Sequence, residues 1–294
     1  MAIPRFGEIA VIGVFDSGSG GLTVMRALEH ALPTESFIYL GDHGNAPYGN
    51  RSPADIYGLT LRGIERLFGL GCSLVIIACN TAAATGLRQL QQTWLPHKYP
   101  QHRVIGIIVP MIEAITGMPW EAEAAPMPPS DGNPALHVAV CATQHTVNTG
   151  AYVTEIAKRA PAIRVSQQAC PELAKMIDDD AGDDAIRPFV RAYVDELLAR
   201  QHDVPDVCIL ACTHYPLIEH LFREALPPQV KLLTQGEVTA ASLRRYLTRH
   251  PRFSAAPSSE APPATVYLTT GDPRHVSAVA GRFYGRVVAF QGIA

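Results

Sequence analysis

The chain has 294 residues, of which 47% are hydrophobic and 17% charged, and its formal net charge at pH 7 is −3. This composition is typical of a globular protein, and the length suggests one large or two ordinary domains with a sizeable core. The near-neutral charge and the lack of a basic patch argue against nucleic acid as the main ligand, and no apolar stretch reaches the roughly 18 residues that a membrane helix needs.

The first part of the chain alternates between strand and helix patterns. Short apolar runs predict strands, and longer stretches with apolar residues at helical spacing predict helices. Ser52 is a candidate N-cap for the second helix, with Pro53 at its first position. The predicted strands are residues 9–15, 36–40, 75–79 and 102–109, and the predicted helices begin at Leu22, Pro53 and Ala82. This alternation favours a doubly wound parallel sheet.

The alternation restarts after a proline-rich segment, 117–134, which we expect to be an exposed loop, as is 253–264. Four further strands are predicted at residues 135–141, 163–167, 231–233 and 266–270, and a fifth ends at Cys212. Helices are predicted at 147–158, 186–200, 216–225, 238–249 and 273–284, with a further helical pattern from Glu172 to Asp178. The fold class is therefore α/β, in two halves that each contain a parallel sheet.

Two similar segments each place a cysteine at the end of an apolar strand. Residues 75–81 read Val-Ile-Ile-Ala-Cys-Asn-Thr, and residues 207–214 read Val-Cys-Ile-Leu-Ala-Cys-Thr-His. Ligands of parallel sheets bind outside the carboxyl ends of the strands, so Cys79 and Cys212 lie where chemistry is expected. The local match also suggests that the two halves are pseudo-symmetric.

A glycine-rich turn, Asp16-Ser-Gly-Ser-Gly-Gly, joins the first strand to the first helix. Such a turn can offer backbone N–H groups to an anion at a helix N-terminus. It lacks the third glycine of a dinucleotide-binding fingerprint and the lysine of a P-loop, so a smaller anion such as a carboxylate fits better. The alternative is a tight turn in which Asp16 only caps the helix.

Four uses of the two cysteines compete. A disulfide or redox pair would need closer spacing or secretion. A zinc site could use Cys208, Cys212 and His214 with Cys79, but no Cys-x-x-Cys spacing occurs. Either cysteine alone could be a nucleophile. The fourth use is a pair of acid–base groups on opposite faces of one carbon, as a racemase needs.

Pyridoxal phosphate is the usual cofactor for racemisation, and it requires a Schiff-base lysine. The chain has only four lysines, Lys98, Lys158, Lys175 and Lys231, and none stands in a glycine- or serine-rich turn at a strand end. A mechanism without a cofactor or a metal is therefore expected.

Seven short motifs, in order along nearly the whole chain, resemble glutamate racemase, the cofactor-independent branch of the aspartate/glutamate racemase family. Besides the glycine-rich turn, they are Gly41-Asp42 with Pro47-Tyr48-Gly49, Ala78-Cys79-Asn80-Thr81, Thr149-Gly150-Ala151-Tyr152, Ala169-Cys170-Pro171, Cys212-Thr213-His214-Tyr215-Pro216-Leu217, and Thr269-Thr270-Gly271-Asp272. The pair of cysteine motifs is the most specific part of the resemblance.

The resemblance implies interconversion of L- and D-glutamate, which supplies D-glutamate for peptidoglycan. It implies that Cys79 takes the proton from the D isomer with help from Asp16, and that Cys212 takes it from the L isomer with help from His214. Asp178 takes the place of the glutamate that supports the histidine in this family. Substrate would be bound by Asp16, Ser17, Pro47, Tyr48, Gly49, Asn80, Thr81, Thr143, Thr146, Thr213 and His214.

The resemblance also implies a domain division, with residues 1–108 and 218–294 in the first domain, 109–217 in the second, and the active site in the cleft between them. The sequence departs from the family at His43-Gly44-Asn45, where a small hydroxylated residue and Ala-Arg are usual, and Asp178 is one methylene shorter than glutamate. His43 and His145 are expected to be loop residues that face solvent.

Two other functions stay open at this point. One is racemisation of a related substrate, aspartate or a hydantoin, and the other is a non-catalytic binding protein on the same scaffold. The N-terminus lacks a signal-peptide pattern and the six cysteines need not pair, so we expect reduced thiols and a cytoplasmic protein. A homodimer without membrane or nucleic-acid partners is expected.

Overall fold

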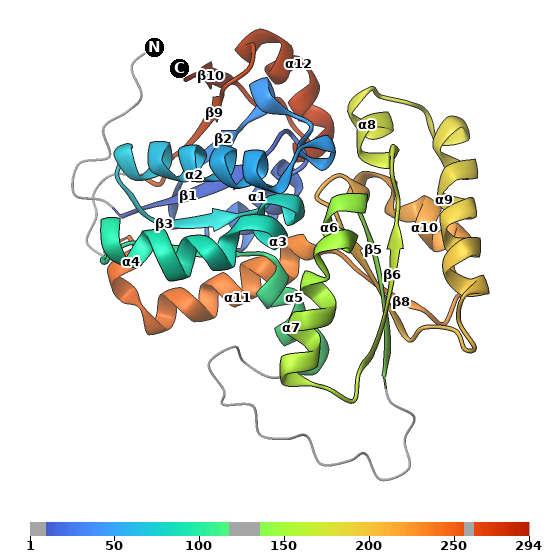
Figure 1. Ribbon diagram of the computed structural model, residues 1–294. Coiled ribbons are helices and arrows are strands. Elements are labelled where there is room, and N and C mark those ends of the chain that lie inside the picture. The colour runs from blue at the N-terminus through green and yellow to red at the C-terminus, as the bar shows by residue number, and fades with distance from the viewer. Residues whose placement is uncertain (1–9, 118–135, 256–261, 294) are drawn as a thin grey trace. The chain divides into compact units, whose positions relative to one another are not determined.

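The computed structural model describes residues 10–117, 136–255 and 262–293. The chain divides into two compact units (Figure 1). The first consists of residues 1–107 and 236–294, and the second of residues 108–235. Most of the two proline-rich segments, which we expected to be exposed loops, lies outside the described residues. Within the described residues, no helix is both long enough and apolar enough to cross a membrane.

The first unit contains a sheet whose paired strands are all parallel. Its strand order is β10-β9-β2-β1-β3-β4. The strands are β1 (Val11–Asp16), β2 (Ser36–Gly41), β3 (Cys72–Ile77), β4 (Arg103–Gly106), β9 (Thr265–Thr269) and β10 (Phe290–Gly292). Every residue of β1 and β2 is buried, which explains why their sequences are continuous apolar runs.

Helices cover both faces of this sheet. They are α1 (Leu22–Ala31), α2 (Pro53–Gly69), α3 (Asn80–Gln89), α4 (Leu95–Lys98), α11 (Gln235–Arg249) and α12 (Pro273–Tyr284), with a π-helical turn at Leu90–Trp94 between α3 and α4. The neighbours α2 and α3 lie on one face, and α1 and α12 pack together on the other. Ser52 caps α2, because its Oγ accepts a hydrogen bond from the N–H of Asp55.

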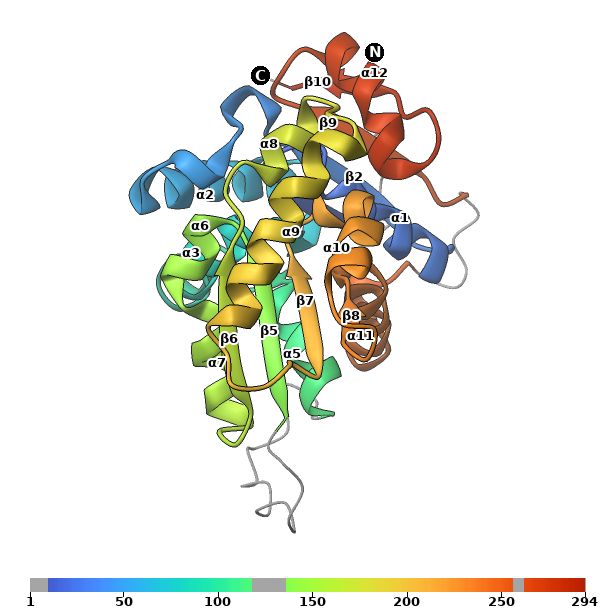
Figure 2. The ribbon, with the colours of Figure 1, turned by 90° about the vertical axis from the view of Figure 1, so that its right-hand side faces the viewer.

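The second unit contains a smaller sheet of paired parallel strands, in the order β6-β5-β7-β8. Its strands are β5 (His137–Ala142), β6 (Arg164–Ala169), β7 (Val207–Ala211) and β8 (Lys231–Leu233). Helices α5 (Ile108–Thr116), α6 (Gln144–Thr149) and α7 (Ala151–Arg159) lie on one face, and α9 (Asp183–Ala199) and α10 (Glu219–Ala225) on the other (Figure 2). The short helix α8 (Leu173–Asp178) contacts α9.

The predicted α/β architecture with two parallel sheets is confirmed, but several boundaries differ from the sequence-based ones. The strand predicted to reach Val109 ends at Gly106, and Ile108 already begins α5. The helix predicted from Val147 to Lys158 is two helices, because Gly150 adopts a left-handed conformation between them. Strand β8 pairs with β7, so residues 218–235 belong to the second unit and not to the first.

Candidate functional site

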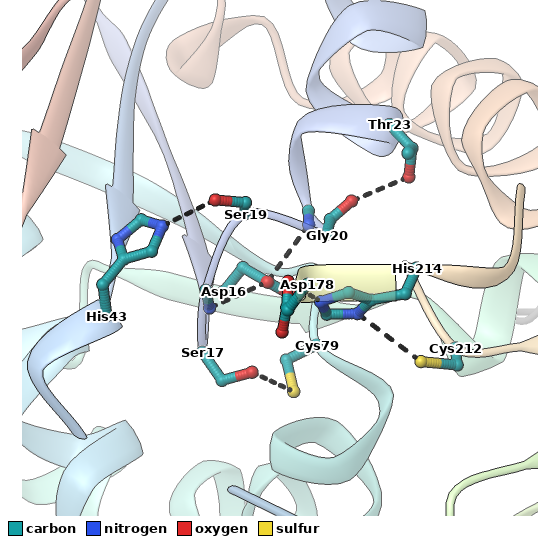
Figure 3. Close-up of polar contacts among 12 residues, drawn as sticks. Asp16, Ser17, Ser19, Gly20, Thr23, His43, Cys79, Asp178, Cys212 and His214 are labelled. Atoms are coloured by element: carbon teal, nitrogen blue, oxygen red, sulfur yellow. Dashed lines mark hydrogen bonds and ion pairs between the residues drawn. The ribbon is translucent and has the colours of Figure 1, made fainter. Parts of the chain in front are cut away.

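In the first unit, three neighbouring strands end together and place their following residues at one edge of the sheet. Strand β1 leads into the glycine-rich turn, β2 into Asp42, and β3 into Ala78 and Cys79. Cys79 is 5% exposed, and its Sγ lies 3.4 Å from Oγ of Ser17 (Figure 3). The turn after β1 and the thiol after β3, both predicted as site elements, are therefore in direct contact.

Cys79 is also the N-cap of α3. Its Sγ accepts a hydrogen bond from the N–H of Ala82 at 3.4 Å. A sulfur at a helix N-terminus is held near unsatisfied N–H groups, which favour its thiolate form. Asn80 and Thr81 form the first turn of this helix and are 3% and 4% exposed.

Asp16 is completely buried and organises the turn that follows it. Its Oδ2 accepts hydrogen bonds from the N–H groups of Gly18 and Gly21, each at 3.1 Å. The carboxylate therefore closes the turn, but it does not cap α1 as the alternative supposed, because the N-cap of this helix is Gly21 and has no side-chain cap hydrogen bond. The closed turn carries Ser17, whose hydroxyl lies beside Cys79.

Tyr48, another predicted site residue, is fixed by a carboxylate that the sequence analysis did not select. Its Oη donates to Oδ2 of Asp42 at 2.6 Å, while Oγ1 of Thr270 donates to Oδ1 at 2.7 Å. Burial, then the neighbouring Asp42, raises the pKa of Tyr48 far above its usual value, so the phenol stays protonated. Pro47, which follows a cis peptide bond, and Gly49 flank this tyrosine.

In the second unit, the carboxyl ends of β5 and β7 carry the other predicted residues. Thr143 caps α6, with its Oγ1 accepting from the N–H of Thr146 and donating to the Oγ1 of that threonine at 3.0 Å. Thr213 is 4% exposed and follows Cys212, which is 6% exposed. Cys212 thus comes directly after the buried end of β7, and Cys79 comes two residues after the buried end of β3, in separate units.

Cys212, His214 and Asp178 form a connected row. The Nδ1 of His214 lies 3.7 Å from Sγ of Cys212, and its Nε2 lies 3.0 Å from Oδ1 of Asp178. Burial opposes the charged imidazole, but the Asp178 carboxylate and Cys212 raise the pKa of His214 well above its usual value. The shorter aspartate therefore reaches the histidine directly, and the histidine is an imidazolium beside the thiol.

The four-ligand zinc hypothesis does not fit the position of Cys208. This residue is inside β7, and its Sγ lies 3.7 Å from Sγ of Cys141 on β5. Among residues 10–117, 136–255 and 262–293, no group of three or more His, Cys, Asp and Glu side chains could hold a metal ion.

His43 was expected to face solvent in a loop, and this expectation is wrong. It is half-buried, and its ring makes hydrogen bonds to Ser19, Gly41 and Thr269. His145 is likewise half-buried and lies in α6. The sequence analysis missed Asp42 and His43 as site-supporting residues, although both follow a strand end, which was the signal used for the two cysteines.

Comparison with known proteins gives a consistent result over almost the full chain. A family model described as Asp/Glu/hydantoin racemase matches residues 12–243. The chain is 44% identical over 285 residues to a glutamate racemase from Phenylobacterium zucineum (strain HLK1), covering 95% of this chain and 99% of that protein. It is 45% identical over 287 residues to one from Caulobacter sp. (strain K31), with the same two coverages.

Two solved structures that resemble the chain are also glutamate racemases. The glutamate racemase isoform RacE1 from Bacillus anthracis superposes with a TM-score of 0.83 at 27% identity, covering 98% of both chains. A glutamate racemase from Francisella tularensis, solved in complex with D-glutamate, superposes with a TM-score of 0.81 at 26% identity and covers 98% of both chains.

Proposed function

The chain belongs to the Asp/Glu/hydantoin racemase family, and we propose that it is a glutamate racemase that interconverts L- and D-glutamate with two thiols and no cofactor. In a bacterial cell, the reaction would supply D-glutamate for peptidoglycan. The observation that carries the proposal is the similarity to named glutamate racemases over 95% of the chain, together with a cysteine at a strand end in each unit.

In the proposed reaction, the α-carbon of glutamate loses one proton and gains another on its opposite face. The Cys212 thiolate takes the α-proton of L-glutamate, and the Cys79 thiol gives its proton to the opposite face of the same carbon. The products are D-glutamate, a Cys212 thiol and a Cys79 thiolate, and the reverse reaction exchanges the two roles. Each cysteine must therefore be able to exist as a thiol and as a thiolate, and the neighbouring groups must stabilise both forms.

Around Cys212, the charged partner is His214. An imidazolium that faces the sulfur at 3.7 Å stabilises the thiolate and can return a proton to it. Asp178 holds Nε2 of the ring as the donor, so Nδ1 is directed toward the sulfur. We assign Asp178 the role of orienting and charging His214, as the resemblance implies.

Around Cys79, two neutral hydrogen-bonding groups contact the sulfur. The N–H of Ala82 and the hydroxyl of Ser17 both lie 3.4 Å from its sulfur. Ser17 can accept from the thiol and donate to the thiolate, so it suits both states of the cycle. Asp16 shapes this site through the turn that it closes.

We assign substrate binding to polar groups at the strand ends. The buried turn and helix N-termini offer N–H groups and hydroxyls that suit the carboxylates of glutamate. The proposed set comprises Asp16, Ser17, Pro47, Tyr48, Gly49, Asn80, Thr81, Thr143, Thr146, Thr213 and His214.

The same proposal includes a homodimer and a cytoplasmic location. Six free cysteines suit a reducing compartment. Since the matching family model also covers aspartate and hydantoin racemases, one of these substrates is the second candidate.

Chiral chromatography tests the proposal directly. The purified protein is incubated separately with L-glutamate, D-glutamate, L-aspartate and D-aspartate, and both enantiomers are quantified over time. Each glutamate isomer should approach an equimolar mixture, while aspartate should react far more slowly. Rapid racemisation of aspartate with none of glutamate would favour the second substrate class, and no reaction with any amino acid would favour a hydantoin substrate or a binding protein.

A further inference from the structure

His43 occupies a site that is built to hold an imidazole. Its Nε2 lies 3.0 Å from Oγ of Ser19, and its Nδ1 lies 3.0 Å from the Gly41 carbonyl oxygen and 2.9 Å from Oγ1 of Thr269. The ring also meets the edge of Phe290, with the two ring centroids 5.6 Å apart. One side chain therefore connects the residues that follow β1 with the ends of β2 and β9.

Two glycines make room for this ring. A Cβ on Gly41 would lie 2.3 Å from Cε1 of His43, and a Cβ on Gly271 would lie 3.0 Å from its Cβ. Real Cβ atoms essentially never approach another atom within 3.0 Å, so a side chain at position 41 would displace the imidazole. A Cβ at position 41 would also lie 2.9 Å from the carbonyl oxygen of Gly18, so both the ring and the backbone of the turn pack closely on this glycine.

The contacts of the ring assign its hydrogens. The Gly41 carbonyl can only accept a hydrogen bond, so the 3.0 Å contact requires a proton on Nδ1. In the neutral ring, Nε2 then carries none and accepts the hydroxyl proton of Ser19. Ser19 therefore directs its proton to His43, while Ser17, two residues earlier, has its hydroxyl beside Cys79.

The turn between β1 and α1 needs such an anchor because of its composition. Gly18, Gly20 and Gly21 have access to many backbone conformations, and ordering them costs more than ordering other residues. Asp16 holds the N–H groups of two of these glycines, and the Tyr39 hydroxyl donates to the Gly18 carbonyl at 2.6 Å. Asp16 and Tyr39 thus hold backbone groups of the turn, whereas His43 holds a side chain of the turn, that of Ser19.

We propose that His43 is a positioning residue that, through Ser19, holds the glycine-rich turn so that the Ser17 hydroxyl stays against the Cys79 sulfur. The role in catalysis rests on the proposed racemase function, but the positioning itself does not. In this arrangement, the Ser17 hydroxyl stabilises the Cys79 thiolate, and loss of the anchor makes that thiolate less favourable. Asp16, Asp42 and Tyr48 are titratable groups of the same unit that interact with one another or with Cys79, and none of them is replaced in the variants of the test.

The test measures the reactivity of Cys79 without substrate. His43→Ala, Ser19→Ala and the double variant are treated with iodoacetamide from pH 6 to 10, and the modification of Cys79 and Cys212 is quantified by mass spectrometry. The plateau rate at high pH reports access to the thiol, and the pH at half the plateau reports how easily the thiolate forms. His275→Ala, which changes an exposed histidine of α12, is the matched control.

The expected result is that the half-plateau pH of Cys79 moves up by about 0.3 to 1 unit in each single variant, which corresponds to a two- to tenfold loss of thiolate. The double variant should shift no further, because both changes break one connection. Cys212 and the His275→Ala protein should be unaffected.

Two outcomes would overturn the proposal. One is an unchanged half-plateau pH for Cys79 in folded Ser19→Ala, which removes only a hydroxyl and so remains informative even where His43→Ala fails to fold. The other is an equal shift at Cys212, which would indicate general loosening. Alkylation needs no substrate, so its result is valid even if the protein does not racemise glutamate. If the protein is an active racemase but its alkylation is unchanged in the variants, only the proposed role of His43 is rejected.

Discussion

The Nε2 of His214 and the Oδ1 of Asp178 lie 3.0 Å apart, and this contact helps to raise the pKa of the buried histidine. The imidazole is 9% exposed and the carboxylate 45% exposed, so solvent weakens their attraction only in part. Without the carboxylate, burial would act on the ring with less opposition and favour the neutral form.

Asp178→Asn should therefore lower the pKa of His214. It should also remove part of the free energy of unfolding that the protonated histidine contributes. A raised histidine pKa stabilises the fold fully below the unfolded value of about 6.5, and this contribution is lost as the pH rises through the folded value. Urea unfolding at pH 6 should show the variant to be less stable by about 0.5–1 kcal/mol, with a smaller difference at pH 9.5. A difference that grows with pH would contradict the assignment.

The same variant should lose activity in a pH-dependent way. We expect kcat in the L-to-D direction to fall roughly tenfold at pH 8, with the alkaline limb of the profile moved to lower pH. Asp178→Glu, which restores the residue usual in the family, should retain most of the activity. Equal losses in the Glu and Asn variants would show that the carboxylate itself has no special role.

Replacing either thiol separates the two half-reactions. Cys79→Ser and Cys212→Ser should each abolish measurable racemisation, because a thiol supplies an anionic base near neutral pH and a serine hydroxyl, which is far less acidic, does not. Elimination from a β-substituted glutamate needs only one base, so Cys212→Ser should process the D analogue and Cys79→Ser the L analogue. If both variants eliminate from the same enantiomer, the assignment of the cysteines to opposite faces is wrong.

Two glycines of α2 give a matched test of packing in the first unit. A Cβ on Gly63 would lie 2.2 Å from Cε2 of Phe15 on β1, whereas a Cβ on Gly69 would meet nothing within 4 Å. Gly63→Ala should lower the free energy of unfolding by about 1–3 kcal/mol. Gly69→Ala should be neutral or raise it by roughly 0.5 kcal/mol. Equal melting temperatures for the two variants would contradict the packing of α2 on β1.

The hydrogen bond from Tyr48 to the buried Asp42 should contribute measurably to stability. Tyr48→Phe removes one donor from a carboxylate that is 3% exposed, and we expect a loss of about 1–3 kcal/mol in urea unfolding. Tyr57→Phe is the control, since the Tyr57 hydroxyl makes no hydrogen bond in the described parts of the chain. A loss as large in the control would show that the ring substitution, and not the hydrogen bond, is responsible.

Activity should survive exhaustive dialysis against EDTA, with a flat absorption spectrum between 320 and 500 nm in the purified protein. The expectation comes from the scarcity of lysines and the lack of metal-ligand spacing in the sequence. Loss of turnover on chelation, restored by zinc, would contradict it.

The sequence predicted those features that depend on local pattern. Buried parallel strands are continuous apolar runs, so β1, β2, β3 and β7 could be found, and with them the strand-end positions of Cys79 and Cys212. The helix predicted at 273–284 is likewise present as α12, which begins at Pro273 and has Asp272 as its N-cap. Strand β10 was missed, because Phe290-Gln291-Gly292 contains one large apolar residue and no apolar run.

The supporting contacts of the site could not be predicted, because they depend on strand register. His43 reaches Thr269 because β2 pairs with β9 in a register that puts Gly41 opposite Thr269. These residues are far apart in the sequence. The Asp42 interaction with Thr270 has the same origin. Local sequence patterns do not reveal which strands become neighbours, so the contacts of His43 could be found only in the structure.

The division of the chain has a consequence for its biosynthesis. All of the second unit lies between two stretches of the first, and β9 and β10 are the last strands to be translated. A ribosome therefore releases the complete β6-β5-β7-β8 sheet while β2 still has an unpaired edge that awaits β9. Exposed edges of this kind are aggregation-prone. Slow translation after residue 235 should thus prolong the time in which a finished domain is attached to an incomplete sheet that depends on chaperones, and a nonsense mutation there should leave that sheet incomplete permanently.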